Sequence, residues 1–551
     1  MKVYAFHVGD TWKMTPKFSL NYGIRYDIST PTVAKYDNLS FLDPNGANPG
    51  AGGRPGRLVF AGDKWGPASY GKSNPEEIYY KAFAPRLGFA YSLSNKTVVR
   101  AGYGVFFLTL SYPSWTSGIS PGTDGFNSNI VFNSSNGGIT PAFLLQDGFP
   151  QNFTPPPFID PTFRNGKSIG LYRPLDAGRP SYSQQWNLTV EREFTKDFYM
   201  TAAYVGNKGT RVLSTVAPIN VLNPSLLSMG QQLYDQFKPG QTVLNGVSIP
   251  YPGWVEQMTQ CPPSVAQALL PYPQYCGNLQ GLNENAGNST FHSFQLKAEK
   301  RFSEGFWVLS SYTWSKNLSS GNDIQSFANQ VTNYGGGTFS PFERQRNKGL
   351  DLADIPHTWS LALTYQLPFG KGKSFLNTAG VADKIFDGWQ ISTVARVQSG
   401  APFYFRSFGQ CNVPSQFSAA CVPAILPGAN PFLQDKGNFD PDKPLFNKAA
   451  FESPDSFNFN YGSGPAVSNL RGFSFHSNDI GILKNTKISE RMTFQIRGEF
   501  VNVWNWHIFA GGATWGGSLG FNLDVASPNF GLWDKTVSSP RNIQIAAKII
   551  F

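Results

Sequence analysis

The chain has 551 residues, and its 56 glycines and 41 prolines are too many for a protein built mainly of long helices. Aromatic residues make up 15% of the chain, and charged residues also make up only 15%, below the roughly 25% that is typical of soluble domains. The formal net charge of +10 is spread along the chain without a run of like charges, which argues against nucleic-acid binding. No apolar run is long enough for a membrane-spanning helix, so helical membrane proteins are excluded as well.

Apolar and polar residues alternate in many segments, which is the pattern of β-strands with one apolar face. The first clear segment runs from 18 to 28, where Phe18 and every second residue up to Ile28 are apolar. Similar segments follow at 87–93, 186–190, 359–367, 494–500 and 543–551. With their flanks they reach about nine to eleven residues, the length of a tilted strand that crosses a bilayer.

The connections between these strands alternate between short and long. Short turns are predicted at 15–17, 94–96, 195–197, 303–305 and 489–491, and a longer turn at 370–387 contains a short helix at 382–386. Long polar stretches occupy 29–84, 109–181, 210–290, 319–356, 400–478 and 507–541. This layout predicts an all-β fold: an antiparallel transmembrane β-barrel, partial, with about 13 strands of a larger barrel, short periplasmic turns and long extracellular loops. A soluble propeller or sandwich is the competing fold, and loops of this length argue against it.

Several segments also resemble a known family. They include 85–91 (PRLGFAY), 204–210 (YVGNKGT), 311–316 (SYTWSK) and the last two strands at 494–505 and 540–551. Together they are similar to the barrel of Oar-like TonB-dependent outer-membrane transporters, over nearly the whole chain. That family implies a plug and a TonB-contacting segment, and export to the outer membrane requires a signal peptide. Residues 1–551, however, are expected to form the barrel portion alone. TonB is therefore expected to act only through missing upstream segments.

The last strand has one alternating apolar face, which is expected to meet lipid. By resemblance, this face is the signal that the barrel-assembly machinery recognises, and it consists of Ile543, Ile545, Ala547, Ile549 and Phe551. The turns place Met1 outside the cell and Phe551 in the periplasm, which makes the strand count odd. First and last strands then run in the same direction and cannot close a barrel, so an open curved sheet or further upstream strands are expected.

Charged residues recur on the polar face of the predicted strands, and basic ones outnumber acidic ones. They are Arg25, Arg86, Arg100, Lys297, Arg396, Arg497 and Lys548, with Glu191, Glu299 and Glu499. We expect these side chains to face the lumen and to pair across strands, and a glycosidase-like carboxylate pair is the competing interpretation. The basic excess slightly favours anionic solutes.

The cysteines lie in two of the long connections, Cys261 with Cys276 and Cys411 with Cys421. Of the three pairings that four cysteines allow, a disulfide within each loop is the simplest. The five histidines are scattered singly, so neither a metal nor another cofactor is expected. The stretch 516–520 (GGSLG) matches a nucleophile elbow, but no helical pattern follows it and no enzyme activity is expected.

Two functions remain at this point. The first is a transporter or receptor barrel in the cell outer membrane of a Gram-negative bacterium, whose partners are outer-membrane lipid, the barrel-assembly machinery and an unidentified solute. The second is a secreted or surface-attached β-rich protein or enzyme that binds carbohydrate through its aromatic loops. A requirement for detergent would separate the two, because only the barrel exposes an apolar face.

Overall fold

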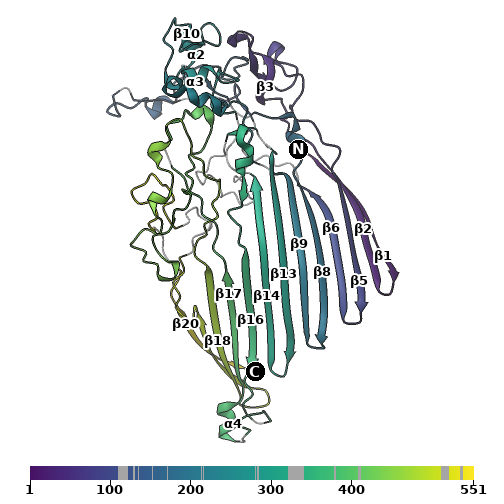
Figure 1. The fold of residues 1–551 in the computed structure, drawn as a ribbon. Helices are drawn as coiled ribbons and strands as arrows, with labels where there is room; N and C mark the ends of the chain where they lie inside the picture. Colours follow the sequence, from purple (N-terminus) through teal and green to yellow (C-terminus); the bar gives the residue numbers. More distant parts are fainter. Residues whose placement is uncertain are drawn as a thin grey trace.

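The computed structural model describes residues 1–108, 122–127, 131–134, 136–151, 153–169, 172–212, 214, 216–279, 281, 285–320, 340–370, 372–377, 380–407, 411–509, 520–533 and 538–551. One curved 14-stranded antiparallel sheet dominates this part of the chain (Figure 1). Its strands follow one another in chain order: β1 (Val3–Thr15), β2 (Phe18–Ser29), β5 (Phe83–Ser94), β6 (Thr97–Phe107), β8 (Tyr182–Thr195), β9 (Phe198–Val212), β13 (Gly287–Ser303), β14 (Phe306–Ser320), β16 (His357–Gln366), β17 (Trp389–Gln398), β18 (Phe475–Lys487), β19 (Thr493–Val501) and β20 (Asn542–Ile550). The short β15 (Lys348–Leu350) pairs with the end of β14.

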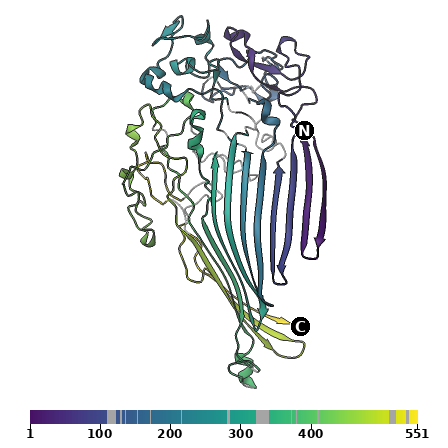
Figure 2. The same ribbon diagram turned by 45° about the vertical axis from the view of Figure 1, so that its right-hand side comes forward.

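Short and long connections lie at opposite ends of the sheet, which we call the turn end and the loop end. Figures 1 and 2 show the hairpin turns at the bottom and the long connections gathered above the strands. The helix α4 (Val381–Phe386) lies at the turn end, where the sequence predicts a short helix. The amino terminus lies at the loop end and the carboxyl terminus at the turn end, so the two termini are separated as expected.

The two faces of the sheet differ in chemistry, and strand register keeps the difference aligned from strand to strand. Phe6 lies opposite Tyr26 and Val8 opposite Ile24, so apolar side chains meet apolar side chains on one face. This apolar face is exposed: 61% of Phe6 and 69% of Val8 are accessible. A soluble protein rarely leaves a continuous apolar surface of this kind uncovered. The other, polar face carries most of the charged residues of the strands.

The sheet is open at both edges. Among the described residues, β1 pairs only with β2 and β20 only with β19, and every residue of β1 is exposed. Both edge strands run from the loop end towards the turn end, so they cannot pair antiparallel with each other. The prediction of about 13 strands in an open, curved sheet is therefore confirmed.

The long connections contain the remaining strands and helices. The strands are β3 (Ser40–Ala47), β4 (Pro55–Phe60), β7 (Lys167–Ser168), β10 (Val243–Leu244), β11 (Val247–Ser248) and β12 (Tyr275–Cys276), and the α-helices are α2 (Trp254–Gln257) and α3 (Val265–Ala268). The 3-10 helices are η1 (Pro49–Ala51), η2 (Gly66–Ala68), η3 (Leu145–Asp147), η4 (Leu175–Gly178), η5 (Pro224–Tyr234), η6 (Pro341–Asn347), η7 (Ser415–Phe417), η8 (Lys436–Asn438), η9 (Lys448–Ala450) and η10 (Pro454–Ser456). Within the described ranges, no helix is both long and apolar enough to cross a membrane.

These connections form a folded layer over the loop end of the sheet. We call the described parts of 30–82, 108–181, 213–286, 399–474 and 502–541 the loop layer. Its cores are hydrophobic, and Trp254, Tyr275 and Phe403 are fully buried in them. The sequence predicts only polar loops here, because no periodic pattern marks residues that are buried by contacts between distant connections.

Candidate functional site

The polar face of the sheet is the candidate site, because it carries the charged residues that the sequence singles out. Register places them all on this face: Arg25, Arg86, Arg100, Glu191, Lys297, Glu299, Arg396, Arg497, Glu499 and Lys548. Arg25, for example, lies opposite His7, and Arg86 lies opposite Gly23. The residues are spread from β2 to β20, so they form a charged wall and not a compact catalytic centre.

Most charges on this wall are neutralised by ion pairs. The pairs are Arg100–Glu191 at 3.3 Å, Arg25–Asp27 at 2.9 Å, Lys297–Glu299 at 3.0 Å and Arg497–Glu499 at 3.2 Å. Among the described residues, Arg100 and Glu191 pair across adjacent strands, whereas each of the other three pairs joins two residues of one strand. Residues two positions apart on a strand point to the same face, so a neighbour on the same strand is within reach. These exposed pairs add little stability, and they reduce the number of uncompensated charges on the wall.

Two residues of this wall were not singled out from the sequence. Asp27 accepts hydrogen bonds from Arg25 Nε at 2.9 and 3.0 Å, and Tyr199 lies directly opposite Glu299. The signal for Asp27 was present, because it follows Arg25 by two positions on a predicted strand. Tyr199 could be found only once the register between β9 and β13 was known.

Two arginines of the wall contact aromatic rings instead of carboxylates. The Arg86 guanidinium lies 4.8 Å from the ring centre of Phe106, and that of Arg396 lies 6.0 Å from the ring centre of Phe475. Neither forms an ion pair with any residue that the structure describes. Cation–π contacts leave the positive charge in place, so these side chains are available to an anionic group.

A groove opens on the sheet between β1, β2 and β5. Its volume is about 830 Å³, within the range of small-molecule sites. Gly9 and Gly23 lie opposite each other in it, and a Cβ atom at Gly23 would lie 2.8 Å from the carbonyl oxygen of Val8. Glycine therefore lets the two backbones approach closely, and polar side chains surround this bare stretch, including His7 and Arg86.

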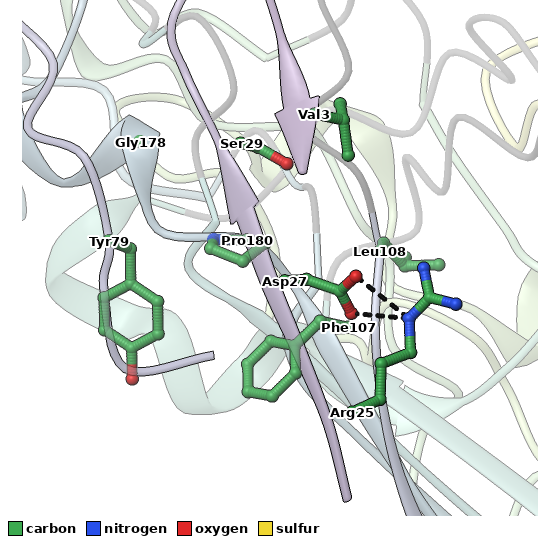
Figure 3. A pocket seen from close by; sticks show the side chains of 9 residues that line it. All are labelled: Val3, Arg25, Asp27, Ser29, Tyr79, Phe107, Leu108, Gly178 and Pro180. Atoms are coloured by element: carbon green, nitrogen blue, oxygen red, sulfur yellow. Dashed lines mark hydrogen bonds and ion pairs between the residues drawn. The ribbon is translucent and has the colours of Figure 1, made fainter. Parts of the chain in front are cut away.

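A smaller cavity lies where the sheet meets the loop layer. Figure 3 shows Tyr79 on one side of it and the Arg25–Asp27 pair on the other, with Pro180 between them. Its volume is about 30 Å³, enough for a single water molecule but not for a solute. The cavity joins the loop layer to the sheet and does not form a binding pocket of its own.

A buried ion pair holds two connections of the loop layer together. Arg173 donates from Nε to Glu76 Oε1 at 2.6 Å and from a terminal nitrogen to Oε2 at 2.8 Å, and neither side chain is exposed. The same nitrogen donates to the carbonyl oxygen of Thr32 at 3.3 Å. Burial raises the pKa of Glu76, and the charge of Arg173 opposes that shift.

Buried amides link three connections in the same layer. Asn48 Nδ2 donates to Asn165 Oδ1 at 2.8 Å and to the hydroxyl of Tyr275 at 3.3 Å. In another part of the layer, Phe403 and Phe446 pack edge to face with ring centres 5.0 Å apart. Beside them, Arg406 donates to the carbonyl oxygens of Phe405 and Ala466, and burial lowers its pKa to about 10.

The cysteines form two disulfides inside the loop layer. Cys261 is bonded to Cys276 and Cys411 to Cys421, which is the pairing that the sequence suggests. Each bond closes a short loop, of 15 and 10 residues in sequence separation. The first bond ties the α2 and α3 region to β12, which contacts β7 of another connection.

Within the described residues, the remaining sequence motifs do not assemble a reactive centre. Of the GGSLG motif only Gly520 is described, so the candidate serine lies outside the described residues. No group of three metal-binding side chains occurs in the parts of the chain that the structure describes. His7 lies on the polar face, whereas His292, His357 and His476 lie on the apolar face beside aromatic rings. The histidines of the described strands therefore lie singly on the sheet.

Comparisons with known proteins bear on this arrangement. No curated protein sequence matches the chain. Solved structures to which the chain is similar include the Pseudomonas aeruginosa FpvA receptor in complex with iron and a pyoverdine (TM-score 0.38, 9% identity), the Acinetobacter baumannii siderophore receptor PiuA (0.36, 9%) and the Neisseria meningitidis FrpB iron transporter (0.38, 10%). The alignments cover 100% of this chain and 38%, 43% and 45% of those chains, so this chain spans less than half of their length.

A family model gives the decisive match. It is described as an outer membrane beta barrel domain, and it matches residues 1–544. The match agrees with the exposed apolar face, which a bilayer would cover, and with the alternation of short turns and long loops. The match is to a membrane barrel and not to an enzyme family. This chain belongs to the outer membrane beta barrel domain family, and its sheet lies in the outer membrane.

Proposed function

We propose that the chain is the barrel portion of an Oar-like TonB-dependent transporter, and that a solute crosses the outer membrane along its polar face. The groove over Gly9 and Gly23 is the observation that carries the proposal. It combines a volume of about 830 Å³ with a polar wall, while the opposite face of the same strands is apolar. In this proposal, segments upstream of the sheet supply the plug and the contact with TonB.

The charges of the wall point to the kind of solute. Four of the basic side chains are neutralised by carboxylates: Arg25, Arg100, Lys297 and Arg497. Arg86 borders the groove and carries a positive charge next to a ring, without an ion pair to a described residue. A solute that places an anionic group near Arg86 would gain a charge-assisted contact at this point.

The test compares cells that carry the complete gene with cells in which it is deleted. Both are grown in the same conditioned medium, and mass spectrometry measures which solutes accumulate. At least one solute should accumulate only when the gene is present, and a protonophore should stop its uptake. Uptake that persists with the protonophore would contradict TonB coupling, and identical solute profiles would contradict transport.

A pair of matched variants tests the role of the wall. Arg86→Gln removes a charge beside the groove, whereas Lys300→Gln removes one from the apolar face of β13 near the turn end. The first should lower uptake severalfold at equal surface levels, and the second should leave it unchanged. Equal uptake in both variants would show that the groove does not contact the solute.

A further inference from the structure

A row of aromatic residues crosses the apolar face near the middle of β9, β13 and β14. Strand register aligns Tyr204, Phe294 and Trp314 on β9, β13 and β14. These side chains are 41%, 41% and 58% exposed, which fits contact with lipid and not burial in protein. Aromatic belts of this kind mark the level at which a bilayer passes from hydrocarbon to headgroups. The row therefore locates the boundary of the outer leaflet on this wall.

Basic side chains lie directly above this row on the same face. We call them the basic rim, and its members are Lys208, His292, Lys316 and Lys348. His292 lies two residues before Phe294 on β13, on the same face and nearer the loop end. It lies opposite Lys316. Lys208 lies opposite Thr290, and Lys348 lies opposite Ser320. The first basic side chains are thus about 7 Å above the aromatic row, given the rise of a β-strand.

The three lysines are close enough to act on one ligand. Lys208 and Lys316 are two strands apart across the sheet and two residues apart along the strand direction. Their Cα atoms are therefore about 12 Å apart. Lys316 and Lys348 are one strand apart across the sheet and four residues apart along the strand direction. Their Cα atoms are therefore about 14 Å apart. Lysine side chains are long and flexible enough to converge across such distances.

Within the part of the chain that the structure describes, no ion pair neutralises the rim. Above the aromatic row, the described apolar-face residues of β8, β9, β13, β14 and β15 include no carboxylate. Lys208 donates to Thr290 Oγ1 at 3.2 Å, and the hydroxyl of Tyr204 is hydrogen-bonded to His292 Nδ1 at 2.7 Å. These neutral partners orient two members of the rim and leave the charges unbalanced. The polar face differs, because most of its charges are paired.

We propose that the basic rim binds the phosphate groups of a lipid headgroup in the outer leaflet. The rim lies at headgroup depth, its charge is positive and unpaired, and the apolar face below it offers a surface for acyl chains. Lysines near a membrane surface attract anionic lipids, and a lipid with several phosphates could contact more than one lysine. The occupant is therefore a phosphorylated lipid of the outer membrane itself.

The experiment titrates the purified full chain in neutral detergent with fluorescently labelled lipid A. The variant Lys208→Gln/Lys316→Gln should bind about twenty-fivefold more weakly, at about fivefold for each lysine near an anionic surface. The matched control is Lys300→Gln/Lys484→Gln, which removes two lysines from the same face near the turn end. Both control lysines already donate to protein oxygens, Lys300 to Ser303 and Lys484 to Asp387.

Three results would overturn the proposal. They are unchanged binding in the rim variant, an equal loss in the control variant, and displacement of lipid A by inorganic phosphate at equal phosphate concentration, which would identify free phosphate as the ligand. Circular dichroism checks that each variant keeps its strands. If the rim variant does not fold, the wild-type chain decides the question, because dephosphorylated lipid A should bind at least tenfold more weakly than lipid A. Equal binding of the two lipids would reject a phosphate site.

Discussion

The buried Glu76–Arg173 pair offers a sharp test of what holds the loop layer together. Both side chains are fully buried, and two short hydrogen bonds join them. Glu76→Gln keeps the shape of the side chain but leaves the Arg173 charge without its carboxylate. Removing one partner of such a buried pair costs about 3 to 5 kcal/mol. Replacing both by apolar residues, as in Glu76→Leu/Arg173→Met, should cost clearly less, because no buried charge then remains.

Hydrogen exchange measured by mass spectrometry can follow this effect in the loop layer alone. Peptides from 39–61 should exchange faster in Glu76→Gln by a factor that corresponds to the lost free energy, while peptides from β13 should not change. The control is Asp440→Asn, which breaks the exposed ion pair of Asp440 with Lys443 and should leave exchange unaltered. If Glu76→Gln alters exchange no more than this control, or if the double variant costs as much as the single one, the buried pair does not stabilise the layer as argued.

Three further predictions concern other parts of the chain. Peptide mapping without reductant should find Cys261 and Cys411 each bonded within its own loop, and replacing either by serine should cost about 3 kcal/mol of local stability on chain-entropy grounds; free thiols or crossed pairs would be contrary evidence. Deleting Phe551, which is 90% exposed at the turn end, should reduce assembly in the outer membrane, and unchanged levels of heat-modifiable barrel in the complete protein would argue against an assembly signal. Gly23→Ala should separate β1 from β2 and speed amide exchange in β1, whereas Gly349→Ala, where an added Cβ meets no atom within 4 Å, should not.

The sheet could be predicted from the sequence because each strand shows a local alternation of apolar and polar residues. From Phe18 to Ile28 a single repeating pattern fixes both the strand and its apolar face. Short turns such as 15–17 then fix which strands are neighbours, and chain order gives the rest. The open edge followed from the number of strands. Strand direction reverses at each connection, so with an odd number the first and last strands run the same way.

The loop layer could not be predicted in this way, because its cores are built from residues far apart in the chain. Asn48 and Tyr275, for example, are hydrogen-bonded across a separation of 227 residues, and no local pattern marks either one. The charged wall is an intermediate case. Its residues were identified because every second residue of a strand lies on the same face. Their partners depend on side-chain conformation, so Asp27 was missed although it lies two positions after Arg25. The basic rim required register as well, since its members come from separate strands.

The contacts around Asn48 also set the order in which the protein can be completed. Asn48, Asn165 and Tyr275 belong to three different connections, and β5, β6, β8 and β9 lie between the first and the last of them. Contacts over such separations form slowly, because the intervening chain must be placed first. This part of the core can therefore form only after all three connections have reached the same side of the membrane. A late block in insertion should leave a protein whose first strands are paired but whose outer surface is still unfolded and open to proteases.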